Sequence, residues 1–218
     1  MELALNIDSQ KSNKDMTKGI TMKASVILAH PYPHSFNHAI YETVVQVFNE
    51  NHVKVYAHDL YEEGFNPVLT KKELGSDQSD DILVNQYAKE LVDSDFLVFI
   101  HPNWWGQPPA ILKGYIDRVI RPPYAYDFPE DDNGGGLPIE KLNGKYGIVY
   151  NTANTNEERE NNYFGDPLDR IWGMCVFGFL GIDKYHRKMF RIIANSSEND
   201  RNNWLQEIEE DIRRILGQ

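Results

Sequence analysis

The segment Phe96–Val119, FLVFIHPNWWGQPPAILKGYIDRV, decides the fold. It opens with FLVFI, the most apolar run in the chain, which we predict to be a central strand buried on both faces. Pro108 and Pro109 stand where a helix would begin, a place that tolerates proline. Beyond them, apolar residues recur at helical spacing, at Ile111, Leu112, Tyr115, Ile116 and Val119. The segment therefore predicts a strand, a loop and a helix in succession.

The same alternation continues on both sides of this segment. The other stretches with strand composition are Ala24–Leu28, Val53–Asp59, Gly147–Tyr150 and Lys184–Ile193. Helical spacing follows Ser35, and recurs over 82–91, around Leu168–Phe179 and from Trp204 to Leu216. Five strands alternating with helices predict an α/β fold with a doubly wound parallel sheet. Such sheets bind ligands beyond the carboxyl ends of their strands, which selects the loops after the first, third and fourth strands.

Composition narrows the class of protein. The chain has 218 residues and a net charge of −11, which argues against DNA or RNA as its main partner. The sequence contains no apolar window of about 18 residues, so we predict no membrane insertion. The single cysteine, Cys175, excludes an intrachain disulfide and fits a reducing cytoplasm. Cys175 is either a reactive thiol or a small core residue, and its apolar neighbours favour the core.

Two further expectations concern the organisation of the chain. Residues 1–22, MELALNIDSQKSNKDMTKGITM, are polar and lack the apolar centre of a secretory signal, so we predict a flexible or extended arm. Residues 23–218 are predicted to form a single domain. The seven histidines include the pair His34 and His38, but no clear third ligand accompanies them, and we predict no metal site.

The loop after the first strand, HPYPHSFN, covers residues 30–37 and leads into a helix. Backbone N–H groups and the helix dipole attract phosphate at such a point. Ser35 and Asn37 add neutral donors, and His30 adds a donor or a charge. Alternatively, Ser35 only caps the helix while the prolines shape a turn. Neither a GxGxxG fingerprint nor a P-loop is present.

The loop after the third strand, PNWWGQPP, covers residues 102–109. Trp104 and Trp105 suit the binding of a flat ring system, and Gly106 allows close approach of the backbone. Packing of a tryptophan in the core is the alternative, and we prefer ring binding. The loop after the fourth strand, Asn151–Asn156, has small polar residues that suit hydrogen bonds to a ligand, although ordinary turns share this composition.

These loops carry a resemblance to a known family. The segment HPNWWGQPPAILKGYIDRV closely resembles the flavin-binding signature of the NAD(P)H:quinone oxidoreductase family of flavodoxin-like flavoproteins. The stretches HPxPxSFN and DLYEEGFNPVLT are also similar, and the matches run in order from Ser25 to Ile193. Bacterial drug-activity-modulator quinone reductases and ancillary reductases of potassium-efflux systems are among the similar proteins. The resemblance implies a flavodoxin-like sheet of strand order 2-1-3-4-5 with helices on both faces.

The resemblance also assigns roles to residues. Positions that hold the flavin phosphate and ribityl chain are matched by His30, Ser35, Phe36 and Asn37. Positions that flank the isoalloxazine ring are matched by Pro102, Asn103, Trp104, Trp105 and Gly106. The third flavin loop is matched by Asn151, Thr152, Ala153 and Asn154. Aromatic residues that cover the substrate site, often from the partner subunit, are matched by Tyr124 and Tyr126, for which loop packing is the alternative.

The sequence departs from the family at the third loop. That loop is Thr-Thr-Gly-Gly-like in the animal enzymes and reads NTAN here. The Tyr and His credited with charge relay in those enzymes have no secure counterpart after Asn154, and Tyr163 is only a loose candidate.

The implied function is a flavin-dependent NAD(P)H oxidoreductase of the quinone reductase type. NADPH or NADH delivers hydride to flavin N5, and a quinone or similar acceptor then takes two electrons in a ping-pong reaction. His30 beside the phosphate loop resembles the FAD-binding members, with FMN as the alternative, and the resemblance implies a homodimer. Two other functions stay open: an ancillary regulatory flavoprotein of a membrane ion-efflux transporter, and a flavodoxin-like electron carrier. The two tryptophans and the long 121–143 loop favour a substrate cavity over the carrier.

Overall fold

A five-stranded parallel sheet forms the centre of the molecule in this computed structural model, which describes residues 21–75 and 78–218. The strands are β1 (Lys23–Leu28), β2 (Lys54–Asp59), β3 (Phe96–Pro102), β6 (Tyr146–Ala153) and β7 (Lys184–Arg191). Their order is β2-β1-β3-β6-β7, so the predicted order 2-1-3-4-5 is confirmed. Residues 1–20 of the predicted N-terminal arm lie outside the described residues.

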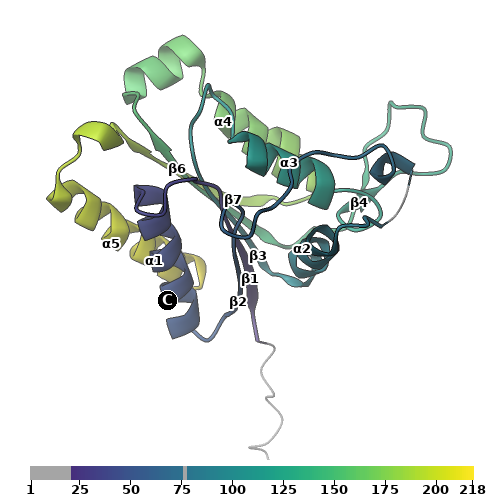
Figure 1. The fold of residues 1–218 in the computed structure, drawn as a ribbon, viewed down its shortest axis with the longest axis horizontal. Coiled ribbons are helices and arrows are strands. Elements are labelled where there is room, and N and C mark those ends of the chain that lie inside the picture. The colour runs from purple at the N-terminus through teal and green to yellow at the C-terminus, as the bar shows by residue number, and fades with distance from the viewer. Residues whose placement is uncertain (1–20, 76–77) are drawn as a thin grey trace, which may run out of the picture.

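Helices cover both faces of the sheet, as predicted (Figure 1). One face carries α1 (Phe36–Glu50) and α5 (Glu198–Ile215). The other carries α2 (Ile82–Asp93), α3 (Ala110–Val119) and α4 (Pro167–Arg170), which the π-helical segment η3 (Ile171–Phe177) continues. Short 3-10 turns complete the chain: η1 (Glu73–Gly75), η4 (Gly178–Leu180) and η5 (Ile193–Asn195).

The central strand β3 explains why both faces are covered. Successive side chains of a strand point to opposite faces, and every residue of β3 is buried. Val98 and Ile100 pack with α1 and α5, while Leu97 and Phe99 pack with α2, α3 and η3. A run that is apolar at every position therefore specifies a two-sided sheet.

Three local predictions were wrong. The loop expected from Asn151 onward begins only after Ala153, because β6 continues to pair with Pro102 of β3 and Arg191 of β7. The predicted loop over 121–143 contains a small hairpin of β4 (Tyr126–Asp127) and β5 (Ile139–Glu140). Cys175 is exposed rather than in the core, because Trp172, Val176 and Phe177 take the buried positions of η3.

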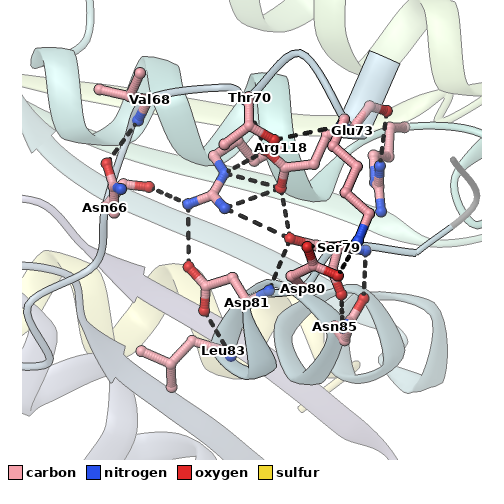
Figure 2. Close-up of polar contacts among 12 residues, drawn as sticks. Asn66, Val68, Thr70, Glu73, Ser79, Asp80, Asp81, Leu83, Asn85 and Arg118 are labelled. Carbon is pink, nitrogen blue, oxygen red and sulfur yellow. Dashed lines mark hydrogen bonds and ion pairs between the residues drawn. The ribbon is translucent and has the colours of Figure 1, made fainter. Parts of the chain in front are cut away.

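A buried ionic network fixes the chain between β2 and α2 onto α3. Figure 2 shows the Arg118 guanidinium at its centre, with Nη2 2.9 Å from Glu73 Oε1 and Nη1 3.1 Å from Asp81 Oδ2. Nη1 also donates to the Asn66 carbonyl, and Ser79 Oγ donates to Glu73 Oε1. The Arg118 and Glu73 side chains are 3% and 2% exposed. The network therefore ties residues 66–81 to the helix that follows the tryptophan loop.

Glu73 is held as a carboxylate by this network. Burial alone would raise its pKa, but hydrogen bonds from Arg118, Ser79 and Thr70 outweigh burial and lower the pKa to about 2.

In the part of the chain that the structure describes, no helix is long and apolar enough to cross a membrane.

We predict that Glu73→Gln lowers stability at neutral pH and removes a component of acid sensitivity. The ordinary carboxyl pKa of 4.5 falls to about 2 in the folded state, so the stabilisation is complete above 4.5 and is lost as pH falls toward 2. That shift corresponds to roughly 3 kcal/mol. Urea unfolding at a series of pH values measures it. Glu62→Gln, at an exposed position, is the control. If the free energy of unfolding of Glu73→Gln varied with pH as steeply as that of the wild type, the prediction would be contradicted.

Candidate functional site

A cavity of about 590 Å³ opens beyond the carboxyl ends of β3 and β6. The switch in strand order lies between β1 and β3, and the cavity adjoins it on the β6 side of β3. The lining residues come from the loop after β3 and the segment after β6: Asn103, Trp105, Gly106, Ala153, Asn154, Thr155, Glu160, Tyr163, Phe164 and Pro167. The two predicted loops therefore meet at one site.

The first wall of the cavity is a tight turn from Trp104 to Gln107. The backbones of these two residues exchange both hydrogen bonds, and Trp105 and Gly106 between them have φ values of 59° and 71°. This is the geometry of a two-residue hairpin turn in which both central residues are left-handed. Trp105 is 101% exposed and Trp104 is 41% exposed, so the core-packing alternative is wrong for both.

Asn103 holds this turn in place through its backbone N–H and both polar atoms of its side chain. The backbone N–H donates to the Thr152 carbonyl at 2.7 Å, and the side-chain oxygen accepts from the Gly106 N–H at 2.9 Å. Its Nδ2 donates to Glu160 Oε1 at 3.0 Å. This one residue thus connects the turn, the end of β6 and η2 (Arg159–Phe164), a π-helical segment that stands out beyond the sheet in light green in Figure 1.

The N-terminus of α1 lies beside the end of β6. Ser35 is its N-cap and accepts from the His38 N–H, which confirms the capping prediction. Asn37 Nδ2 donates to Thr152 Oγ1 at 2.9 Å, but Asn37 Oδ1 is buried and has no hydrogen-bond partner among the described residues. The N–H groups of Phe36 and Asn37 donate to no group in the described part of the chain. The N-terminus of α1 therefore offers two backbone N–H donors and one side-chain oxygen acceptor that have no partner among the described residues.

His38, which the sequence did not mark as a site residue, also lies at the N-terminus of α1. His38 Nδ1 lies 2.9 Å from Ser35 Oγ, and His38 Nε2 lies 3.0 Å from Asp59 Oδ2 at the end of β2. The His30 ring lies 6.2 Å from the Trp104 ring, and partial burial lowers the pKa of His30. His30 therefore connects the helix end with the tryptophan turn.

Behind the cavity lies a buried polar chain. His101 Nδ1 donates to the Pro102 carbonyl, while His101 Nε2 accepts from Trp172 Nε1 at 3.0 Å and Asn151 Nδ2 at 2.8 Å. Burial lowers the pKa of His101 to about 3, so the ring is neutral, as these bonds require. Arg187 donates to Asn151 Oδ1 and pairs with Asp166 at 2.8 Å. Asn151 therefore supports the site from behind.

Several predicted site residues do not reach the cavity within one chain. Phe36 packs against Phe190 and Trp204, between α1 and α5. Tyr126 packs edge-on against Phe179, 5.1 Å between ring centroids, and neither Tyr124 nor Tyr126 lines the cavity. Sequence reasoning also missed Glu160 and Arg187, because both stand in polar stretches without a motif.

The comparisons with known proteins define the family. The family described as flavodoxin-like fold matches residues 22–216. An uncharacterised NAD(P)H oxidoreductase of Haemophilus influenzae is 31% identical over 177 residues, which cover 78% of this chain and 83% of that protein. NAD(P)H dehydrogenase [quinone] 1 of Rattus norvegicus is 29% identical, over 49% of this chain and 46% of that enzyme.

Solved structures agree with this assignment. Smu.1420 of Streptococcus mutans has a TM-score of 0.74 at 28% identity, covering 88% of this chain and all of that one. An FMN-dependent NADH-azoreductase of Bacillus anthracis, in complex with FMN, has a TM-score of 0.71 at 18% identity, covering 89% of this chain and 99% of that one. The chain belongs to the flavodoxin-like fold family, and its curated relatives are oxidoreductases by name.

Gly106→Ala should destabilise the protein more than Gly64→Ala. Both glycines have positive φ, and a left-handed alanine costs about 1–2 kcal/mol. A Cβ at Gly106 would lie 2.6 Å from Pro167 Cγ, whereas nothing lies within 4 Å at Gly64. Urea unfolding of both variants isolates the contact between the turn and α4. Equal losses in the two variants would show that the contact adds nothing.

Proposed function

We propose that the protein is a flavin-dependent NAD(P)H oxidoreductase that reduces a quinone or similar acceptor by a ping-pong hydride transfer. The observation that carries the proposal is the meeting of the tryptophan turn with the end of β6 at one cavity, beside an α1 N-terminus that has unused donors. The names of relatives, NAD(P)H oxidoreductase and NAD(P)H dehydrogenase [quinone] 1, support it.

The residues present fit a flavin. The phosphate end requires N–H donors, which Phe36 and Asn37 offer together with the Ser35 cap. A polyhydroxyl chain requires an acceptor, and Asn37 Oδ1 is buried without a partner. A flat ring requires an aromatic wall and close backbone approach, which Trp105 and Gly106 supply at the cavity.

When bound, the flavin accepts a hydride from NADH or NADPH and passes two electrons to the acceptor. The chain's own residues orient the ring, with Asn103 fixing the turn that carries Trp105. We propose FAD as the cofactor, because His30 lies next to the N-terminus of α1, where the flavin phosphate is proposed to bind. The FMN-bound azoreductase neighbour supports FMN as the alternative.

We further propose a homodimer located in the cytoplasm. Tyr124 and Tyr126 do not line the cavity of their own chain. We propose that they cover the substrate site of the partner subunit instead. Phe128 and Phe179, which pack against the Tyr126 ring, are exposed aromatic residues that a second copy would cover.

One experiment separates this function from its alternatives. We expect purified protein to bind FAD or FMN, to lose flavin absorbance under anaerobic NADPH or NADH, and to regain it with a quinone. Mass spectrometry of the released flavin identifies the cofactor. Flavin that NAD(P)H does not reduce would favour an electron carrier, and reduction without turnover would favour an ancillary protein of a transporter. Protein that takes up neither flavin contradicts the proposal.

Trp105→Ala should weaken flavin binding by roughly tenfold, because aromatic stacking is worth about 0.5–1.5 kcal/mol beyond buried area. Ile82→Ala is the control, since Ile82 is also exposed, at 81%, and lies in α2 away from the cavity. Titration of the apoprotein with flavin, followed by fluorescence quenching, measures both affinities. Equal affinities for Trp105→Ala and the wild type would remove Trp105 from the ring site.

A further inference from the structure

Glu160 is a buried carboxyl group in the wall of the cavity. Only 2% of the residue is exposed, yet it is one of the residues that line the cavity. It belongs to the π-helical segment η2, whose other residues, Arg159 and Asn161–Phe164, are exposed. The geometry of this segment therefore turns a single acidic side chain inward.

Glu160 has little to compensate a negative charge. Its Oε1 accepts one hydrogen bond, from Asn103 Nδ2, and Oε2 receives none within residues 21–75 and 78–218. No ion pair involves Glu160 in that part of the chain. The two arginines near this end of the sheet bond elsewhere, Arg159 to Thr155 and the Asn154 carbonyl, and Arg187 to Asp166.

A carboxylate that is buried and has no cation beside it is poorly solvated. Glu73 shows the contrast, because it is also buried but is paired with Arg118. The Glu160 carboxyl lies in the wall of the cavity, so it is placed to pass a proton to a bound molecule that becomes anionic. Buried and uncompensated acids at ligand cavities are typical of functional sites.

The proposed reaction requires such a proton. A quinone that receives a hydride gains two electrons and one proton, and its second oxygen is then anionic. One more proton makes the neutral hydroquinone. Among the described residues that line the cavity, Glu160 and Tyr163 are the acids, and Tyr163 is 82% exposed.

We propose that Glu160 is the proton donor to the reduced acceptor, an inference that rests on the proposed function. The carboxyl O–H bond of Glu160 breaks, and a new O–H bond forms on the acceptor oxygen. The electron pair comes from NAD(P)H through the flavin, and the Glu160 carboxylate regains a proton from water after the product leaves. Asn103 holds the Glu160 carboxyl through Oε1, which leaves Oε2 free to face the acceptor.

Glu160→Gln tests this role, because the amide oxygen of glutamine still accepts the Asn103 hydrogen bond but the acid is gone. The flavin-loaded protein is reduced with NADPH and mixed with 1,4-naphthoquinone or with ferricyanide, which takes one electron at a time and no proton. We expect quinone reduction to slow by roughly 10²–10⁴-fold and ferricyanide reduction to stay unchanged.

Three controls separate an acid from a structural residue. Glu157→Gln removes an exposed carboxylate just before η2 and should leave both rates unchanged. Tyr163→Phe should keep the wild-type ratio of the quinone rate to the ferricyanide rate. Glu160→Asp keeps an acid but shortens its reach, so its quinone rate should fall less than that of Glu160→Gln. Flavin affinity and thermal melting of each variant report whether the site is intact.

Other outcomes would overturn the inference. Equal slowing with quinone and ferricyanide would mean that Glu160 acts only by positioning Asn103. An unchanged quinone rate in Glu160→Gln, or identical behaviour of the Gln and Asp variants, would exclude the acid role. Failure of the proposed function looks different, because wild-type protein would then bind no flavin or reduce neither acceptor.

Discussion

Parallel pairing between β3 and β6 is the constraint on which the site depends. The pairing stays in register from Phe96 with Tyr146 to Pro102 with Thr152, so both strands end at the same edge. Asn103 therefore leaves the sheet beside Ala153, the last residue of β6, and a hydrogen bond from the Asn103 N–H to the Thr152 carbonyl continues the ladder by one step. This unbroken ladder fixes the position of the turn that carries Trp105.

The polar chain behind the cavity makes that register possible. A strand that contains His101 and another that contains Asn151 would each bury a polar group at high cost if left alone. Paired with each other, with Trp172 and with Arg187, they satisfy one another inside the sheet. Because the His101 ring is neutral and Arg187 is paired with Asp166, the network adds no net charge beneath a site proposed to hold an anionic cofactor.

The fold was predictable from the sequence because its signals are local. FLVFI, the Ser35 cap and the helical spacing of the last residues each specify one element, and the order of elements specifies the sheet. The site was predictable only where a motif marks it, as at Trp104–Gly106. Glu160, Arg187 and the pair His38–Asp59 depend on contacts between distant segments, which no local pattern reveals. The end of β6 was missed for the same reason, because the partner of Asn151 is on another strand.

The position of β7 has a consequence for the solution behaviour of the protein. β7 is an outer strand of the sheet, with β6 on one side only. Open strands invite pairing with other molecules, and cationic side chains oppose it. The sequence of β7, KYHRKMFR, is rich in Lys and Arg although the whole chain has a net charge of −11. Two copies that met along this strand would bring like charges together, so its composition protects the open side of the sheet against edge-to-edge aggregation.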